Sequence, residues 1–234
     1  MSTTAPTPPI KSYYENYWST GKQVYSGSNQ GYAANFRRWM AEELRDLPAG
    51  APILEVGCGD GAFTTELAKY SSFVTALDLS ASQIEENRRR FPGIAFAQHD
   101  VAEPLPFPDA AFNVAWCSEV LEHLFDPAFA LREMHRVLRP GGRLLVTVPY
   151  HGGLKNVLIA LFKWDEHFTP SNPHLRFFTP RTLSRITRAA GFEDLRVRSC
   201  GMGRPLRDLI VPTNILLRAT RGPATLPVSV PAAA

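Results

Sequence analysis

The chain contains few cysteines and no long hydrophobic run. Its three cysteines, Cys58, Cys117 and Cys200, are odd in number and lack the spacing of a metal site. Two of them lie in apolar, strand-like stretches, which indicates buried, reduced thiols of a cytoplasmic protein. No apolar run approaches the ~18 residues of a membrane-spanning helix, and the N-terminus lacks the basic-then-apolar layout of a secretion signal. We therefore expect a cytoplasmic protein without a membrane span.

A large excess of charge is also absent. The formal net charge is +3, and the dense basic run Arg88–Arg90 has the position expected for the end of a solvated helix. A nucleic-acid-binding surface would show a larger basic excess, so we expect no nucleic-acid partner. The 234 residues are enough for one domain with a large core.

Apolar strand patterns alternate with helical patterns along most of the chain. Such alternation is typical of a parallel sheet with helices on both faces. We predict the α/β class, a Rossmann-like, doubly wound, mostly parallel sheet of seven strands, with the last strand antiparallel at the edge. The expected strands are 53–57, 73–79, 94–98, 112–117, 143–148, 195–200 and 214–220, and the expected helices are 12–20, 35–47, 61–69, 80–91, 127–138 and 180–190. Ser80, Asp126 and Thr179 are the expected caps of the last three helices.

Composition suggests where the domain begins and ends. Residues 1–11 are rich in Ser, Thr and Pro, and residues 221–234 in Pro, Ala and Val, so we expect flexible tails around a single domain at 12–220. Residues 150–178 interrupt the alternation after the fifth strand and are a candidate substrate lid. The helix at 12–20 is either a plug in an apolar groove or a lid over a cofactor. It carries two candidate substrate residues, Tyr14 and Trp18.

The segment Pro52–Phe63 combines a buried strand, a glycine turn and the start of a helix. Glycine at every second position from Gly57 to Gly61 lets a ligand approach free backbone N–H groups beside a positive helix end. A loose dinucleotide fingerprint fits, with Asp78 at the place of a ribose-binding acid. Asp60 in the turn would repel a pyrophosphate, but not a ligand with an ammonium group, a sulfonium and no phosphate.

Several motifs in order make the resemblance to one family specific. The segment Leu54–Gly61, LEVGCGDG, resembles the first motif of class I S-adenosylmethionine-dependent methyltransferases. Asn113 stands where the family usually has Asp, which leaves the role of that acid open. The resemblance covers 53–148 strongly and implies the fold, the activity and the cofactor of that family. Four later segments also match the family: Ala76–Ser80, His99–Val101, Leu105–Val114 with its "LPFPDxxFD" pattern, and Leu138–Leu144 with its "LxPGGxL" pattern.

The resemblance implies roles for residues at matching positions. Asp78 would hold both ribose hydroxyls, and Asp100 would accept a hydrogen bond from the adenine amino group. Backbone groups around Gly57 and Gly59 would take the methionine moiety, while Glu55 would support the turn or the ammonium group. The other candidate cofactor residues are Cys58, Leu79, Val101 and Cys117, of which Leu79 and Val101 either sandwich adenine or belong to the core.

Acceptor chemistry is expected just beyond the fourth strand. If the segment there is helical, Glu119, Glu122 and His123 share one face. In one interpretation His123 is a general base. In a second, the three side chains, completed by His167 or His174, hold a divalent metal that polarises acceptor oxygens. This second interpretation rests on a resemblance to the Glu-x-x-Glu-His of metal-dependent methyltransferases of catechol-like quinone precursors or RNA ends. In a third, His123 only packs the turn.

The insertion mixes aromatic and polar side chains, as a small-molecule pocket does. His151, His167 and His174 are therefore candidate substrate residues. We expect an S-adenosylmethionine-dependent enzyme that methylates a small molecule, preferably at oxygen, in secondary-metabolite or glycan biosynthesis, as a monomer or homodimer.

Four other functions remain open. They are a metal-assisted O-methyltransferase of a catechol or quinone precursor, an N-methyltransferase of a small amine, an NAD-type oxidoreductase and a non-catalytic cofactor-binding regulator. A divalent metal is not the favoured cofactor.

Overall fold

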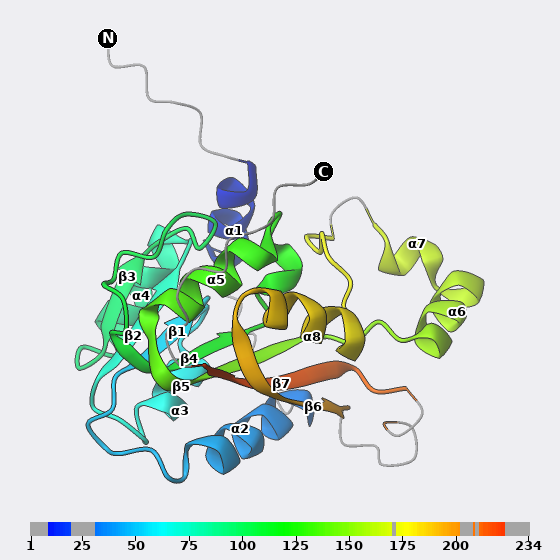
Figure 1. Cartoon of the computed structure of the whole chain (residues 1–234). Helices are drawn as coiled ribbons and strands as arrows, with labels where there is room; N and C mark the ends of the chain where they lie inside the picture. Colours follow the sequence, from blue (N-terminus) through cyan, green and yellow to red (C-terminus); the bar gives the residue numbers. More distant parts are fainter. Residues whose placement is uncertain (1–8, 20–30, 170–171, 202–207, 209–210, 223–234) are drawn as a thin grey trace, which may run out of the picture.

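A seven-stranded sheet forms the centre of the molecule, in the order β3-β2-β1-β4-β5-β7-β6 (Figure 1). A computed structural model describes residues 9–19, 31–169, 172–201, 208 and 211–222. All strand pairs are parallel except those of β7, which runs antiparallel to β5 and β6. The predicted fold class is thus confirmed, but the last strand is not at the edge as predicted, because β7 lies between β5 and the edge strand β6. The strands are β1 Ile53–Val56, β2 Val74–Asp78, β3 Ala95–Gln98, β4 Phe112–Ser118, β5 Leu138–Pro149, β6 Phe192–Cys200 and β7 Asn214–Arg221.

Helices connect the strands, and three of them begin at the predicted caps. The side chain of Ser80 accepts a hydrogen bond from Gln83 N, Asp126 accepts one from Phe129 N, and Thr179 forms a capping box with Thr182. Among the described helices, none is long and apolar enough to cross a membrane. The helices are α1 Pro9–Ser19, α2 Gly31–Leu44, α3 Ala62–Leu67, α4 Ala81–Arg90, the 3-10 turn η1 Leu121–His123, α5 Pro127–Val137, α6 Gly153–Phe162, α7 Trp164–His167 and α8 Pro180–Ala189.

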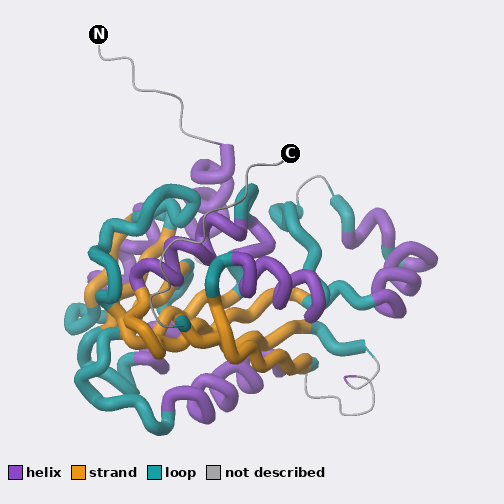
Figure 2. Tube along the Cα trace, viewed as in Figure 1, coloured by secondary structure: helices purple, strands orange, loops and turns teal. Residues whose placement is uncertain are grey.

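Both faces of the sheet are covered by helices (Figures 1 and 2). On one face, α5 and α8 pack on alternate residues of the central strands, such as Val56 and Val146. On the other face, α2 and α3 pack on the residues between them, such as Ile53 and Leu145. The central strands are buried on both sides, which explains why their sequences are almost continuously apolar. A ligand can therefore reach the ends of the strands but not the faces of the sheet.

Several boundaries differ from the predicted ones. The expected fifth strand at 143–148 is longer, because Pro140–Gly142 lies inside β5 and not in a turn before it. The register between β4 and β5 shifts there, and Gly141 adopts φ +76°, which indicates a bulge. Similarly, β6 begins at Phe192 instead of residue 195. The expected tail at 1–11 overlaps α1, which starts at Pro9, and the expected tail at 221–234 overlaps β7, which ends at Arg221. Residues 1–8 and 223–234 lie outside the described residues.

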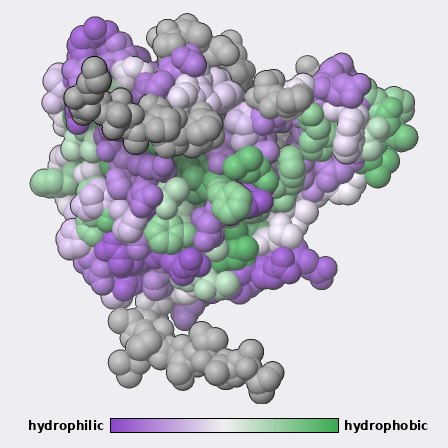
Figure 3. All heavy atoms as spheres, turned by 90° about the horizontal axis from the view of Figure 1, so that it is seen from above, coloured by the Kyte–Doolittle hydropathy of each residue, from purple (hydrophilic) through white to green (hydrophobic). Residues whose placement is uncertain are grey.

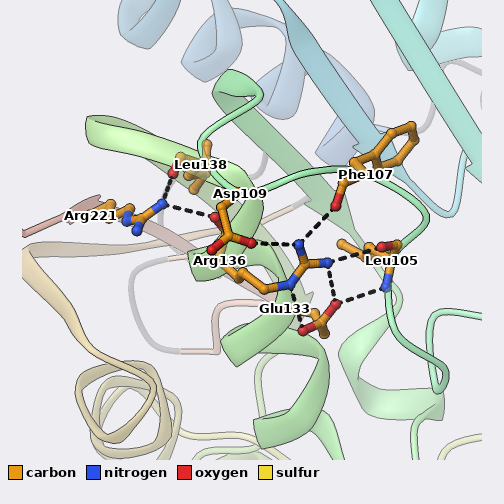
Figure 4. Close-up of polar contacts among 7 residues, drawn as sticks. All are labelled: Leu105, Phe107, Asp109, Glu133, Arg136, Leu138 and Arg221. Atoms are coloured by element: carbon orange, nitrogen blue, oxygen red, sulfur yellow. Dashed lines mark hydrogen bonds and ion pairs between the residues drawn. The ribbon is translucent and has the colours of Figure 1, made fainter. Parts of the chain in front are cut away.

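The proline-rich loop before β4 is attached to α5 through one guanidinium group (Figure 4). Arg136 donates hydrogen bonds to the carbonyl oxygens of Leu105 and Phe107 and to the carboxylates of Asp109 and Glu133. Glu133 in turn accepts a hydrogen bond from Leu105 N. One side chain thus satisfies loop carbonyls that regular structure does not pair.

We expect Arg136→Ala to lower the free energy of unfolding by about 2 kcal/mol, because two loop carbonyls and two carboxylates lose a charged donor. Arg89→Ala is the matched control, since Arg89 pairs only with Glu86 on an exposed helix face and should cost less than about 1 kcal/mol. Urea denaturation measures both values. Equal losses in the two variants would contradict the role given to Arg136.

Candidate cofactor and acceptor site

A cavity of about 710 Å³ lies at the carboxyl ends of β1, β2, β3 and β4. Ligands of open α/β sheets bind at this edge. Helix α1 and the segment Pro173–Leu175 contribute further walls. Of the residues expected in a site, twelve line the cavity: Tyr14, Gly57, Cys58, Gly59, Asp78, Leu79, Asp100, Val101, Glu119, Glu122, His123 and His174. Glu55, Cys117, His151 and His167 do not line it.

The glycine turn after β1 is closed by its own hydrogen bonds. The N–H groups of Gly57 and Cys58 both donate to Leu77 O, at 2.8 and 2.9 Å, and Gly61 N donates to Cys58 O. Gly59 N donates to the carboxylate of Asp78 at 2.9 Å. The expectation of free N–H groups in this turn is therefore wrong, because β2 and the turn itself use them. A turn whose donors are occupied cannot cradle a pyrophosphate.

Side chains are excluded from the start of this turn by close packing. Gly57 has φ +75°, and a Cβ atom placed on it would lie 2.3 Å from Cγ2 of Val120. Both the dihedral angle and this contact require glycine. The segment after β4 therefore packs directly against the turn after β1, so the expected cofactor and acceptor regions share one wall.

Asp78 lies at the end of β2 with its carboxylate against the cavity. One oxygen accepts from Gly59 N and the other from Ser80 N, at 2.9 and 3.0 Å. Burial raises the pKa of this carboxyl, and the two N–H groups oppose that rise. Each oxygen keeps a further lone pair, so Asp78 can still accept hydrogen bonds from two adjacent hydroxyl groups. Asp100 lines the same cavity, and one of its oxygens accepts from Ala102 N.

Two of the expected cofactor residues lie behind the cavity wall. Glu55 is buried, and its Oε2 has no hydrogen-bond partner among the described residues. Burial raises the pKa of Glu55 to about 8, and the neighbouring Asp60 and Asp78 add to the rise. Cys117 is fully buried in the core beneath the end of β4. We attribute the misplacement to strand alternation, which turns these side chains away from the edge.

The segment after β4 is not the helix that would align its acids. Glu119 has φ +55°, and only Leu121–His123 form a 3-10 turn. The Glu119 carboxylate accepts from Thr147 Oγ1 at 2.9 Å and from Asn214 Nδ2 at 3.0 Å. These bonds to β5 and β7 occupy the Glu119 carboxylate, and Glu119 is not among the residues whose ligand atoms come together, which are Glu122, His123 and His174. Burial raises the pKa of Glu119 to about 7, against the effect of both donors.

Glu122, His123 and His174 do come together. One ligand atom from each lies within 4.8 Å of the others. The cluster forms because the carbonyl of Glu122 accepts from Leu175 N and Arg176 N, at 2.8 and 3.0 Å, which holds the end of the insertion against η1. The Glu122 side chain is 1% exposed, and neither carboxylate oxygen has a hydrogen-bond partner among the described residues. Burial and the charge of Glu119 raise the pKa of Glu122.

The ring of His123 is held in a defined orientation. Its Nδ1 lies 3.3 Å from the carbonyl of Pro173, which favours a proton on Nδ1 and leaves Nε2 as an acceptor. Nε2 lies 3.7 Å from Oε1 of Glu122. Burial and the neighbouring His174 lower the pKa of His123 to about 4. At neutral pH, His123 therefore presents an unprotonated nitrogen.

Helix α1 brings tyrosines over this group. The ring of Tyr14 meets that of His123 edge-on at 5.8 Å, and its buried hydroxyl has no partner among the described residues. Tyr13 and Tyr17 also line the cavity. Glu15 attaches α1 to the N-terminus of α4, where its carboxylate accepts from Ala81 N at 2.6 Å and from the hydroxyls of Ser80 and Ser82. The lid interpretation of α1 fits this placement, and aromatic residues at helical spacing were the signal for it.

The remaining candidate substrate residues lie elsewhere. The rings of His151 and His167 are tilted against each other with their centroids 5.4 Å apart, and His151 also meets Phe177 edge-on at 4.8 Å, outside the cavity. Of the insertion, only its end at 173–175 reaches the site, so α6 and α7 do not cover it as expected of a lid. Trp18 belongs to α1, but its side chain lies outside what the structure describes.

Two polar residues of this region were not predicted as site residues. Thr147 and Asn214 position Glu119, yet both look like ordinary strand residues in the sequence. The one signal is that Asn214 places a buried amide directly before three apolar residues, Ile215–Leu217. Such a residue needs a partner, but the sequence does not show which one.

The fold and this edge site together define a class of enzyme that binds a nucleoside without a phosphate cradle. Residues 54–146 match the family model described as a methyltransferase domain. The chain is 32% identical over 176 residues to a protein of Mycolicibacterium smegmatis called "probable S-adenosylmethionine-dependent methyltransferase", covering 74% of the chain and 65% of that relative. The chain belongs to the S-adenosylmethionine-dependent methyltransferases. It spans less than two thirds of the length of this relative.

Other similarities are consistent with this membership. The chain is 30% identical over 185 residues to the malonyl-[acyl-carrier protein] O-methyltransferase of Erwinia billingiae, covering 74% of the chain and 73% of that protein. The fold also resembles the crystal structure of the [4+2]-cyclase SpnF, with a TM-score of 0.67, 22% identity, and coverage of 94% of this chain and 99% of that one. Because SpnF is named a cyclase, the fold alone does not define the reaction.

We expect Glu122→Gln to raise the stability of the ligand-free protein at pH 8. The folded-state pKa of Glu122 lies above the unfolded value of 4.5. The folded state therefore binds the proton more tightly, and stability falls as pH rises above that value. The amide of the variant does not titrate, so its stability does not fall with pH in this way. The free energy of unfolding of the variant should therefore exceed that of the wild type by about 1–2 kcal/mol at pH 8 and equal it near pH 4.

Thermal unfolding between pH 4 and pH 8 measures the effect. Glu133→Gln is the control of opposite sign, because the Arg136 hydrogen bond lowers the pKa of Glu133, and this variant should lose stability at pH 8. A Glu122→Gln variant that is less stable than the wild type at pH 8 would show that the Glu122 carboxylate has a partner in solution.

Proposed function

We propose that the protein transfers the methyl group of S-adenosylmethionine to a hydroxyl of a small-molecule acceptor, with His123 as general base. Family membership supports the cofactor. The name of the Erwinia billingiae relative supports oxygen as the target atom. The observation that carries the catalytic part of the proposal is the half-buried ring of His123, which lines the cavity and is held at Nδ1 by the carbonyl of Pro173.

The residues of the cavity fit the cofactor. Asp78 retains acceptor capacity for the two ribose hydroxyls, and Asp100 lines the wall for the adenine amino group. Leu79 and Val101 offer apolar contacts on either side of a base. The occupied N–H groups of the glycine turn suit a ligand without phosphate. When bound, S-adenosylmethionine supplies an electrophilic methyl group.

The chain's own residues then handle the acceptor. His123 accepts the proton of the acceptor hydroxyl at Nε2, and the carbonyl of Pro173 keeps the proton on Nδ1 in place. Tyr14 and the end of the insertion at Pro173–Leu175 restrict the orientation of the acceptor and exclude water. Orientation supplies much of the rate enhancement in a displacement of this kind.

A second function has its own observation. Glu122, His123 and His174 are spaced to hold a divalent metal, which would polarise the oxygens of a catechol-like acceptor. Glu119 is absent from this set because Thr147 and Asn214 occupy it. Three protein ligands with mixed nitrogen and oxygen donors suit a metal that keeps open positions.

We expect Asp78→Asn to weaken binding of S-adenosylmethionine about 10–100-fold, because a charged acceptor of two hydroxyls is lost. Isothermal titration calorimetry measures the affinity. Glu85→Gln on the exposed side of α4 serves as the control and should leave the affinity unchanged. An Asp78→Asn variant that binds with wild-type affinity would remove Asp78 from the proposed cofactor site.

We expect His123→Ala to lower kcat about 10²–10⁴-fold while S-adenosylmethionine binds normally. Because burial lowers the pKa of His123 to about 4, the acid limb of the rate profile should lie well below pH 6. A screen of hydroxyl and amine acceptors with labelled cofactor provides the assay, with and without EDTA.

Retained activity in EDTA, together with the loss in His123→Ala, supports the general base. Loss of activity in EDTA, restored by a divalent metal, favours the metal-assisted reaction instead. Wild-type kcat in His123→Ala with every acceptor that turns over would remove both roles from His123.

A further inference from the structure

Helix α6 exposes its apolar face to solvent. Leu154, Val157, Leu158, Leu161 and Phe162 recur at the spacing of one helix face and are 51, 55, 41, 67 and 73% exposed. A surface helix normally turns such a stripe to the core. Only Ile159 of α6 is a buried hydrophobic residue. In Figure 3, hydrophobic residues gather at the projecting right-hand end of the molecule, where Figure 1 places α6.

The α6 stripe continues towards the mouth of the cavity. Trp164, which is 57% exposed, contacts Phe168 at 4.6 Å, and Phe168 contacts Phe177 at 5.5 Å. Phe177 follows the exposed cavity residue Leu175 by two positions and is itself 45% exposed. Phe125, which also lines the cavity and lies against Arg176, is 83% exposed. Apolar and aromatic side chains thus connect α6 to the cavity.

Positive charge adjoins this apolar surface. Arg181, Arg185 and Arg188 recur on one exposed face of α8, and no ion pair joins them to another described residue. Arg181 is four positions beyond Phe177, a span of at most about 14 Å. Next to the α6 stripe, the charge of Lys163 is balanced by an ion pair with Glu166 at 2.6 Å. The net charge available to a partner therefore comes from α8.

We propose that the α6 stripe, together with Trp164 and the arginines of α8, docks the protein on the surface of an anionic lipid bilayer. Helix α6 has ten residues, about 15 Å of length, so it cannot span a bilayer and would lie in the plane of the interface. Tryptophan and phenylalanine beside the stripe suit the interfacial layer, and the arginines attract anionic headgroups.

The arrangement disfavours the other occupants of such a surface. A twofold contact between two copies through α6 would bring the same basic face towards itself, and juxtaposed like charges oppose association. A protein partner would meet a row of five large apolar side chains with no polar residue among them, whereas protein interfaces combine apolar cores with frequent hydrogen bonds. A lipid surface needs neither complementary shape nor hydrogen bonds along the stripe.

Co-sedimentation of the full chain with vesicles tests the proposal. We expect binding to vesicles that contain phosphatidylglycerol and weaker binding to pure phosphatidylcholine. Leu158→Glu combined with Leu161→Glu should reduce binding to both kinds of vesicle, about ten-fold or more for each leucine. Arg181→Glu combined with Arg185→Glu should reduce only the binding to phosphatidylglycerol vesicles, about five-fold or more for each arginine.

Phe73→Glu is the matched control. Phe73 is 62% exposed, like the stripe residues. It lies at the amino end of β2, whereas α6 follows the carboxyl end of the parallel strand β5, so this variant should bind vesicles as the wild type does. Unchanged affinity for S-adenosylmethionine in all variants shows that they are folded and separates this test from that of the proposed function.

Three results would overturn the proposal. They are a wild-type protein that stays in solution with both kinds of vesicle, stripe variants that bind as tightly as the wild type, and a lipid-free dimer by analytical ultracentrifugation that the stripe variant dissociates. The last result would assign the stripe to a second copy of the chain.

Discussion

The carbonyl oxygen of Leu77 accepts hydrogen bonds from two successive N–H groups, those of Gly57 and Cys58, and this small feature constrains the whole site. It ties the turn after β1 to the end of β2, and Asp78 extends the same link through Gly59 N. The turn is then closed enough for Val120 to pack against Gly57. As a result, the cofactor wall and the acceptor wall are fixed relative to each other before any ligand arrives. Such preorganisation is what a displacement reaction requires of its enzyme.

The site also concentrates buried acids. Glu55, Asp78 and Glu122 are buried and Glu119 is half-buried, and the loss of contact with water raises the pKa of each. Removing charged groups from water destabilises the fold unless they have partners, and Glu122 has no hydrogen-bond partner for its carboxylate among the described residues. A cationic ligand would relieve the repulsion among these groups. The acids beside the cavity thus lower the stability of the ligand-free protein, and in the proposed function they adjoin the place of a cationic sulfonium cofactor.

Local signals in the sequence predicted the local structure well. The caps at Ser80, Asp126 and Thr179 begin helices because their side chains bond to N–H groups a few residues away, and nothing distant is needed. The sequence also predicted that the site lies at the carboxyl ends of the strands. This prediction was possible because the parallel order of the strands follows from their alternation with helices. Glu119 was misread because its conformation depends on Thr147 and Asn214, which lie 28 and 95 positions further along the chain.

The insertion at 150–178 is a second case in which contacts with distant residues decided the structure. Its aromatic and histidine content predicted a pocket, yet His151 and His167 pair with each other and only the end of the segment reaches the cavity. Composition alone does not determine the direction in which a segment leaves the sheet. That direction is set here by two hydrogen bonds to the carbonyl of Glu122, which the sequence cannot reveal.

The attachment of α1 bears on the speed of the catalytic cycle. Its tyrosines line the cavity, and one carboxylate, that of Glu15, grips the first turn of α4. In the proposed function, release of the spent cofactor past α1 would require these Glu15 contacts to open, and one of the residues that Glu15 holds, Ser80, also caps the helix after Asp78. Product release and loosening of that helix end would then be coupled, so a hinge motion would limit turnover wherever bond making is faster.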